Sequence, residues 1–257
     1  MILNTISRGD GPALVLLHGL FGQAGNFGTV QRRLAQAGLR TIALDLRNHG
    51  ASPRARGMDY RTMADDVRET LAALGVLPCA VLGHSMGGKA AMALALCHPA
   101  AISRLCVADI APVRYPPHLA TYAKAMRDLA LLPSLTRAQA DAALSPAVPD
   151  NGVRGFLLSN LRLGPTPEWR IDLDEIIDGM DDIQDWPEID APPFVAPTLF
   201  LAGARSHYVR PEHRPAIVAL FPSARFVTLK NAGHWLHADD PEGFLTVVQA
   251  FSAMPPA

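Results

Sequence analysis

Short runs of apolar residues alternate with longer segments of helical periodicity along most of the chain. Such runs are typical of strands buried on both faces of a parallel sheet, and they occupy residues 13–17, 40–44, 80–82, 105–110, 197–203 and 224–229. The segments between them predict helices over residues 30–38, 63–74, 90–96, 215–221 and 241–251. With residues 1–7 as an edge strand, this alternation predicts an α/β fold built on a mostly parallel, doubly wound sheet.

The pattern changes between residues 112 and 193, where no strand-like apolar run occurs. Helical stretches at 119–132, 136–144 and 151–163 are followed by an acidic segment at 172–185. We therefore expect a helical cap over residues 112–193, inserted between two parts of an α/β core, 1–111 and 194–257. Five apolar residues are candidates for the inner face of the cap, each more typical of cap core than of substrate contact: Leu157, Leu158, Leu161, Trp169 and Trp186.

Composition narrows the class of protein. The chain has 257 residues, of which 49% are hydrophobic, so it can bury a sizeable core. Its formal net charge of −1 gives no indication of binding to nucleic acid or to an anionic membrane surface.

The cysteines Cys79, Cys97 and Cys106 lie in apolar stretches, which favours reduced thiols. No signal pattern begins the sequence and no apolar run approaches the roughly 20 residues that span a bilayer. We expect a soluble cytoplasmic protein, and the sequence leaves its oligomeric state open.

A glycine-rich turn joins the strand at 80–82 to the alanine-rich helix that follows. It reads Gly83-His84-Ser85-Met86-Gly87, the G-x-S-x-G pattern of a nucleophile elbow. A tight strand-to-helix turn strains the backbone of the central serine, and the neighbours two residues away must lack side chains. The Ser85 hydroxyl would then stand clear of the sheet. The backbone N–H of Met86 would lie beside it at the start of the helix, where developing negative charge is favoured.

The same residues allow two other interpretations. Gly83-x4-Gly88-Lys89-Ala90 is one residue short of a phosphate-binding P-loop, which needs Ser or Thr after the lysine to reach a metal ion. Ala90 has no hydroxyl, and a P-loop leaves the histidine and glycine motifs elsewhere in the chain without a role. An alanine-rich helix after an ordinary glycine turn is the plainer alternative.

A serine nucleophile needs an adjacent base, and the sequence offers nine histidines. His234 lies in a glycine-preceded loop after the last predicted strand, where this order of elements presents its base. His84 adjoins the serine, but on a sharp elbow its side chain points away from it. His18 begins the loop His18-Gly19-Leu20-Phe21-Gly22, the expected source of a second oxyanion-hole amide. No cysteine or carboxylate cluster completes a metal site with His234 and His237, so we expect no zinc.

The acid that would orient the base has more than one candidate. Many enzymes with this order of elements place it after the strand that follows the cap. Residues 203–209 contain no carboxylate, and Ser206 stands about where an aspartate would be expected. Asp109 ends the strand after the elbow helix, and neighbouring strand ends would bring it within reach of His234. Asp109 could instead only cap a turn, and Glu212 is the first carboxylate after the loop.

Together, these motifs resemble the α/β-hydrolase superfamily and, more narrowly, the YbfF-type esterases of bacteria. The resemblance runs through nearly the whole chain and is weakest across the cap. It rests on these segments: His18-Gly19-Leu20-Phe21-Gly22, Asp45-x-Arg47-Asn48-His49-Gly50-x-Ser52, Gly83-His84-Ser85-Met86-Gly87-Gly88-Lys89-Ala90, Asp109-Ile110-Ala111-Pro112 and Gly233-His234-Trp235. Asp45 and Arg47 are expected to form a structural ion pair or a turn rather than to act in catalysis.

The resemblance implies a cofactor-free serine hydrolase that cleaves carboxylic esters or acyl thioesters through an acyl-enzyme intermediate. Ser85 would attack the acyl carbonyl and His234 would move its proton. Asp109, at the position that YbfF-type enzymes use, would hold the imidazole with a supporting hydrogen bond from Ser206. The oxyanion would be bound by the N–H groups of Met86 and Leu20, with Phe21 as the nearby alternative. The expected pocket residues are Phe21, Leu157 and Trp169.

Other functions fit the same motifs. Perhydrolysis, carbon–carbon cleavage and lyase reactions can share one triad, because a fold does not fix its chemistry. A non-catalytic ligand-binding module on this scaffold is an alternative from another class, and labelling with a serine-directed organophosphate would separate it from an enzyme. Dehalogenation is disfavoured because Ser85 stands where those enzymes need a carboxylate. The expected partner is a small-molecule acyl ester or thioester.

Overall fold

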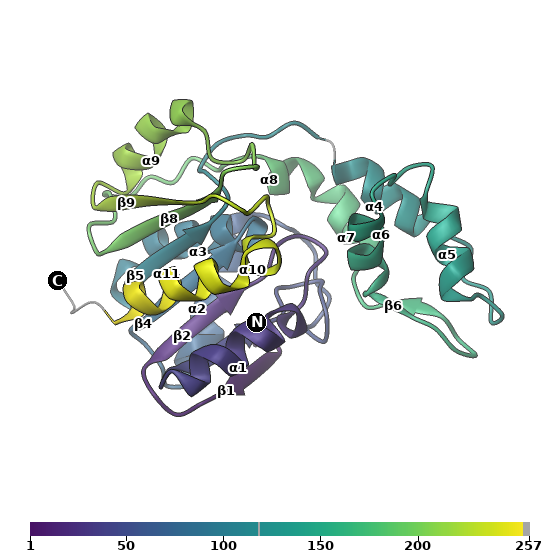
Figure 1. Ribbon diagram of the computed structural model, residues 1–257, viewed down its shortest axis with the longest axis horizontal. Coiled ribbons are helices and arrows are strands. Elements are labelled where there is room, and N and C mark those ends of the chain that lie inside the picture. Colours follow the sequence, from purple (N-terminus) through teal and green to yellow (C-terminus); the bar gives the residue numbers. More distant parts are fainter. Residues whose placement is uncertain (118, 254–257) are drawn as a thin grey trace.

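A seven-stranded sheet forms the centre of the computed structural model, which describes residues 1–117 and 119–253 (Figure 1). Its strands, in the spatial order β1-β3-β2-β4-β5-β8-β9, are β1 (Thr5–Arg8), β2 (Ala13–Leu17), β3 (Arg40–Leu44), β4 (Cys79–His84), β5 (Ile102–Ala108), β8 (Thr198–Gly203) and β9 (Ala224–Leu229). β1 pairs with β3 in the antiparallel sense, and the other neighbours are parallel. The predicted α/β fold with a mostly parallel sheet is therefore confirmed. Residue 118 of the expected cap and residues 254–257 of the expected core lie outside the described residues.

Helices cover both faces of this sheet, which explains why its strands are apolar at successive positions. Leu14 and Leu16 of β2 belong to the core under α1 (Gly28–Gln36) and α11 (Pro241–Ser252). Val15 and Leu17 point the other way, because successive strand residues face opposite sides, and they belong to the core under α2 (Tyr60–Ala73) and α3 (Met86–Cys97). Figure 1 shows the two helix pairs on opposite sides of the sheet.

The central strands end in register, and this places three predicted site residues on one edge of the sheet. β4 lies between β2 and β5, with Leu17 opposite Gly83 and His84 opposite Ala108. The residues that follow these strand ends are His18, Ser85 and Asp109. Loops at the carboxyl ends of parallel strands are where such sheets bind their ligands.

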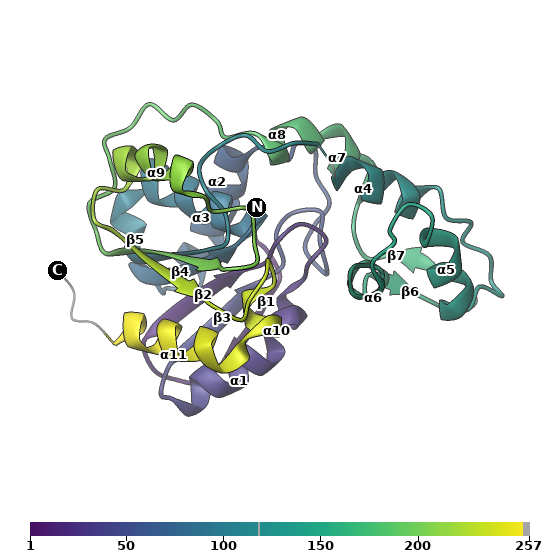
Figure 2. The same ribbon diagram turned by 45° about the horizontal axis from the view of Figure 1, so that its top comes forward.

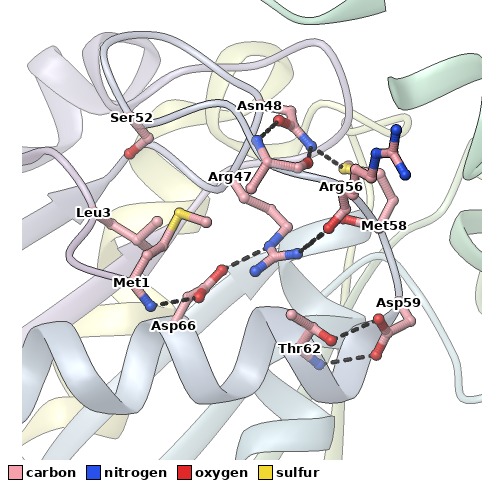
Figure 3. Close-up of polar contacts among 12 residues, drawn as sticks. Met1, Leu3, Arg47, Asn48, Ser52, Arg56, Met58, Asp59, Thr62 and Asp66 are labelled. Atoms are coloured by element: carbon pink, nitrogen blue, oxygen red, sulfur yellow. Dashed lines mark hydrogen bonds and ion pairs between the residues drawn. The ribbon is translucent and has the colours of Figure 1, made fainter. Parts of the chain in front are cut away.

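The loop between β3 and α2 is held by buried polar contacts (Figure 3). Nε of Arg47 lies 2.6 Å from Oδ2 of Asp66, and its guanidinium also donates to the carbonyl oxygen of Arg56. Asp45 instead accepts from the N–H of Ala24 at 2.6 Å and of Ala51 at 2.8 Å, so it organises turns. Of the two structural roles expected for Asp45 and Arg47, a turn or an ion pair, the contacts of Asp45 agree with the turn. The ion pair is wrong, because Asp66 on α2 is the partner of Arg47.

The start of α2 is set by its N-cap residue, which hydrophobic periodicity does not predict. Periodicity predicts a helix from Met63, whereas α2 begins at Tyr60. Asp59 is the N-cap, and its carboxylate accepts from the N–H of Thr62 at 2.9 Å and from its hydroxyl at 2.6 Å (Figure 3). The capping residue therefore sets the first turn, ahead of the first strongly apolar position.

Between β5 and β8 the chain forms a mainly helical segment that projects beyond one end of the sheet (Figures 1 and 2). Its helices are α4 (Leu119–Arg127), α5 (Arg137–Leu144), α6 (Asn151–Leu158), α7 (Leu173–Asp178) and α8 (Met180–Gln184). The helix expected at 151–163 is too long, because α6 ends at Leu158 and a small hairpin of β6 (Leu161–Arg162) and β7 (Glu168–Trp169) follows before α7. Gly164, Pro165 and Pro167 lie in the turn of this hairpin, where proline cannot continue a helix. The division into core and cap stays a prediction.

The remaining elements complete the second half of the sheet. α9 (Arg214–Leu220) connects β8 to β9, and α10 (Leu236–Asp239) precedes α11. Within residues 1–117 and 119–253, no helix has the length and apolar character needed to cross a membrane.

Candidate active site

Ser85 sits at the junction of β4 and α3 with a left-handed backbone, φ 53° and ψ −120°. Two glycines permit this turn. A Cβ atom at Gly83 would lie 2.1 Å from the carbonyl oxygen of Gly87, and one at Gly87 would lie 2.4 Å from that of Leu17. No other residue fits at such approaches, which is the steric reason for the G-x-S-x-G spacing. Ser85 is N-terminal to α3, so the free N–H groups of the first helical turn lie beside its side chain.

Asp109 connects three segments that are distant in the sequence. It is fully buried and follows β5 with a φ of 53°. Its Oδ1 accepts from the N–H of Gly203 at 3.1 Å, and its Oδ2 accepts from Nδ1–H of His234 at 2.8 Å, across 125 residues of sequence. The Ser206 hydroxyl donates to the same Oδ2. The structure therefore brings together Asp109, Ser206 and His234, while Glu212 lies with Arg210 at the surface.

His234 is positioned by the rings around it. The ring of Tyr208 stacks on the imidazole at a centroid distance of 4.1 Å, and the ring of His84 lies 4.7 Å away. Nε2–H of His84 donates to the carbonyl oxygen of His234 at 2.8 Å, and burial holds the pKa of His84 well below its usual range. His237 lies 5.5 Å from His84, and burial lowers its pKa to about 4. In the described part of the chain, no three His, Cys, Asp or Glu residues form a cluster that could hold a metal ion.

Ser85 and His234 line one large cavity of about 720 Å³. Among the described residues no hydrogen bond joins the Ser85 hydroxyl to His234. Phe21 and Leu157, two of the expected pocket residues, also line this cavity, together with Val30, Val153, Phe156 and Trp235. Trp169 is not part of this lining. Its side chain is buried in the core of the cap region, which departs from the expectation that it contacts substrate.

The loop after β2 is held by two buried histidines. Nε2 of His18 accepts from the N–H of Leu46 at 3.0 Å, and Nε2 of His49 accepts from the N–H of Phe21 at 3.2 Å. Burial lowers the pKa of both rings, that of His49 to about 3, so both accept as neutral imidazoles. The N–H of Phe21 is therefore occupied inside the protein. This contact disfavours Phe21 as the oxyanion donor expected from this loop.

Sequence reasoning did not identify three further residues around Ser85. Tyr208 stacks on His234, and no periodic pattern marks it. Lys89, four residues after the serine, is 1% exposed although lysine is rarely buried. Asn160, between α6 and β6, donates from Nδ2 to the carbonyl oxygen of Phe21 at 2.7 Å and so joins the cap region to the loop after β2. The order of polar residues along the chain does not reveal such contacts.

The fold and the site define a class of protein. The chain belongs to the α/β-hydrolase family, whose family model, described as "Alpha/beta hydrolase family", matches residues 14–247.

Named relatives in this family are similar over most of their length. The chain is 42% identical over 250 residues to the sn-1-specific diacylglycerol lipase ABHD11 of Mus musculus, covering 94% of this chain and 81% of the mouse protein. It is 37% identical to the esterase YbfF of Escherichia coli K12, covering 93% and 92% of the two chains. Among solved structures, a marine microorganism esterase superposes with a TM-score of 0.93 at 33% identity, covering 97% of this chain and 99% of that one.

Proposed function

We propose that this α/β-hydrolase is a serine esterase in which Ser85 is the nucleophile, His234 the general base and Asp109 the acid. The observation that carries the assignment is the hydrogen bond of 2.8 Å between His234 and the buried Asp109, beside a serine on a nucleophile elbow. The family and the esterases and lipase similar to this chain support ester hydrolysis by a serine enzyme.

The proposed reaction proceeds in two halves. His234 Nε2 removes the Ser85 hydroxyl proton while the oxygen attacks the acyl carbonyl, and the same proton passes to the leaving alcohol or thiol. Water then attacks the acyl-enzyme carbonyl while His234 Nε2 takes one of its protons. The bond between the acyl carbon and the Ser85 oxygen breaks, His234 returns the proton to that oxygen, and the carboxylic acid leaves. Asp109 accepts from Nδ1–H throughout, which keeps Nε2 free to accept the proton. The N–H groups of Met86 and Leu20 would bind the oxyanion.

The cavity supports an acyl ester or thioester with an apolar chain as the substrate. Its volume of about 720 Å³ and its apolar side chains suit a chain-bearing substrate that lies against Phe21 and Leu157. The mouse relative is named a diacylglycerol lipase and the bacterial relative an esterase, which favours esters over the other reactions of this fold. We also propose that the protein acts in the cytoplasm.

Labelling with a fluorophosphonate tests this proposal. Mass spectrometry should place one adduct on the peptide that contains Ser85, and Ser85→Ala should lose both the adduct and ester turnover by a factor on the order of 10⁶. His207→Gln is a control, because His207 is exposed, does not line the cavity and is not one of the residues that donate to Asp109. An active Ser85→Ala protein would refute the mechanism.

A further inference from the structure

Ser85 lines two cavities of very different size. Besides the large one, a cavity of about 30 Å³ also reaches the serine, and four residues line both cavities: Leu20, Ser85, Leu119 and Tyr208. The lining of the small cavity also includes Tyr60, Met86, Lys89, Ile110, Tyr115 and Gln184. An acyl or leaving group bound to Ser85 can therefore extend in two directions, one spacious and apolar, the other narrow and edged by polar side chains.

Lys89 is fixed in this small cavity. Its Nζ donates to the carbonyl oxygens of Gln184 at 3.0 Å and of Asp185 at 2.6 Å, and it lies 5.0 Å from the ring centre of Tyr115. Two of the three ammonium hydrogens are used in these contacts, so a third remains for a ligand. These contacts compensate its positive charge only in part, because burial lowers the pKa of Lys89 to about 7.

Gln184, which also lines the small cavity, has an amide group without hydrogen-bond partners. Its side chain is 4% exposed, yet neither Nε2 nor Oε1 has a hydrogen-bond partner within the described part of the chain. A buried amide without partners costs free energy, and native proteins rarely contain one. The amide therefore offers two N–H donors and one acceptor oxygen to a bound molecule, in a cavity with room for a small group only.

We propose that the small cavity is a subsite for the hydroxyl group of a short hydroxyacyl chain on Ser85. A hydroxyl both donates and accepts, so it can satisfy both ends of the Gln184 amide and take the remaining hydrogen of Lys89. A carboxylate only accepts and would leave Oε1 of Gln184 unpaired. The inference rests on the proposed function, because it requires that Ser85 carries the acyl group.

Isosteric esters test the subsite. The 4-nitrophenyl esters of 3-hydroxybutyrate and 3-methylbutyrate differ by a hydroxyl in place of a methyl group. After correction for their rates of alkaline hydrolysis, the native enzyme should prefer the hydroxyl ester by about tenfold in kcat/KM, the value of one well-made hydrogen bond. A second pair, the hemisuccinate and 4-methylpentanoate esters, replaces a neutral branched end by a carboxylate. The carboxylate should bring no such gain.

Gln184→Leu should reduce the hydroxyl preference to about one while the 3-methylbutyrate ester is still cleaved. The substitution keeps the Gln184 backbone carbonyl that accepts from Lys89 and from the N–H of Tyr115. Leu157→Ala, in the large cavity, is the matched control and should retain the preference. The same preference in Gln184→Leu, no preference in the native enzyme, or a preference for the carboxylate ester would overturn the inference. If no ester is cleaved and Ser85 takes no fluorophosphonate, the proposed function itself fails.

Discussion

At the scale of single residues, the carboxylate of Asp109 has contacts that a neutral amide cannot copy. Each oxygen accepts hydrogen bonds, from Gly203 at Oδ1 and from His234 and Ser206 at Oδ2. In Asp109→Asn, an amide NH₂ facing His234 would favour the tautomer with the proton on Nε2, which cannot accept a proton from the serine. We expect kcat for a short-chain ester to fall by something approaching 10⁴.

Ser206→Ala is the comparison for this measurement. It removes one hydrogen bond from Asp109 but keeps the charge and the contact with His234, so kcat should fall far less. Nearly native turnover in Asp109→Asn would show that another group orients the base. Circular dichroism of each variant checks that the buried site still folds.

Gln184 permits a prediction about stability that does not depend on a substrate. Replacing its unpartnered amide by an apolar side chain of similar size removes a buried polar group and no hydrogen bond of the side chain. The free energy of unfolding of Gln184→Leu, measured by urea denaturation, should rise by about 1–2 kcal/mol. Lys89→Met is the opposite case and should lower the same quantity. It leaves the carbonyl oxygen of Asp185 without the Lys89 donor, and that of Gln184 with the N–H of Tyr115 alone.

At the scale of elements, the loops after β2 and β3 are joined by neutral histidines, and this makes their stability depend on pH. The pKa of His49 is about 3 in the folded protein because of burial and the nearby His18, against about 6.5 in an unfolded chain. The unfolded state therefore binds more protons between these values. The contribution of His49 is fully present above about pH 6.5 and is lost as the pH falls toward 3.

Urea denaturation between pH 7 and pH 4.5 measures this effect. His49→Gln should reduce the slope of unfolding free energy against pH by about 1.4 kcal/mol per pH unit below pH 6, because glutamine can accept from Phe21 without taking up a proton. His207→Gln, at an exposed position, should leave the slope as it is. An unchanged slope in His49→Gln would mean that the His49 ring is protonated in the folded state.

Elements buried on both faces were the most predictable part of the fold. The ranges 13–17 and 40–44 agree with β2 and β3 at both ends, because a run of apolar residues between polar turns has only one structural explanation in this context. The range 224–229 also agrees with β9, although this edge strand is only partly buried. Helix ends were less predictable. They depend on capping contacts such as that of Asp59, which periodicity does not include.

At the scale of the whole molecule, the large cavity is shared between the core and the segment expected to be the cap. Phe21 contributes from the core side and Leu157 from α6. Leu157→Ala would enlarge the cavity, so relative kcat/KM across esters of graded acyl length should shift toward longer chains by about tenfold. Trp169→Ala is the control, since Trp169 is buried but does not line the cavity. It should lower stability by about 3–5 kcal/mol and keep the chain-length profile. A flat profile in Leu157→Ala would place the acyl chain elsewhere.

The candidate site was predictable where topology alone brings residues together. Ser85 and Asp109 follow two strands that are consecutive in the chain, and parallel strands of one sheet end at the same edge. The choice of Asp109 over Glu212 as the acid needs the family resemblance, because chain order alone leaves both open. Lys89, Gln184 and Asn160 could not be found in this way. Whether a lysine is buried or an amide lacks a partner depends on how the cap region packs on the core, and the sequence pattern is weakest there.

The hydrogen bond from Asn160 to the carbonyl oxygen of Phe21 has a consequence for selectivity. It ties the segment over the cavity to the same short loop that would present the Leu20 N–H. A substrate too bulky for the cavity would push this segment outward and shift the loop, while still burying most of its own apolar surface. Such a molecule would bind with a low Michaelis constant but would be hydrolysed with a low turnover number. We therefore expect the enzyme to sort its substrates by turnover number more than by Michaelis constant, so that ill-fitting esters act as competitive inhibitors of well-fitting ones.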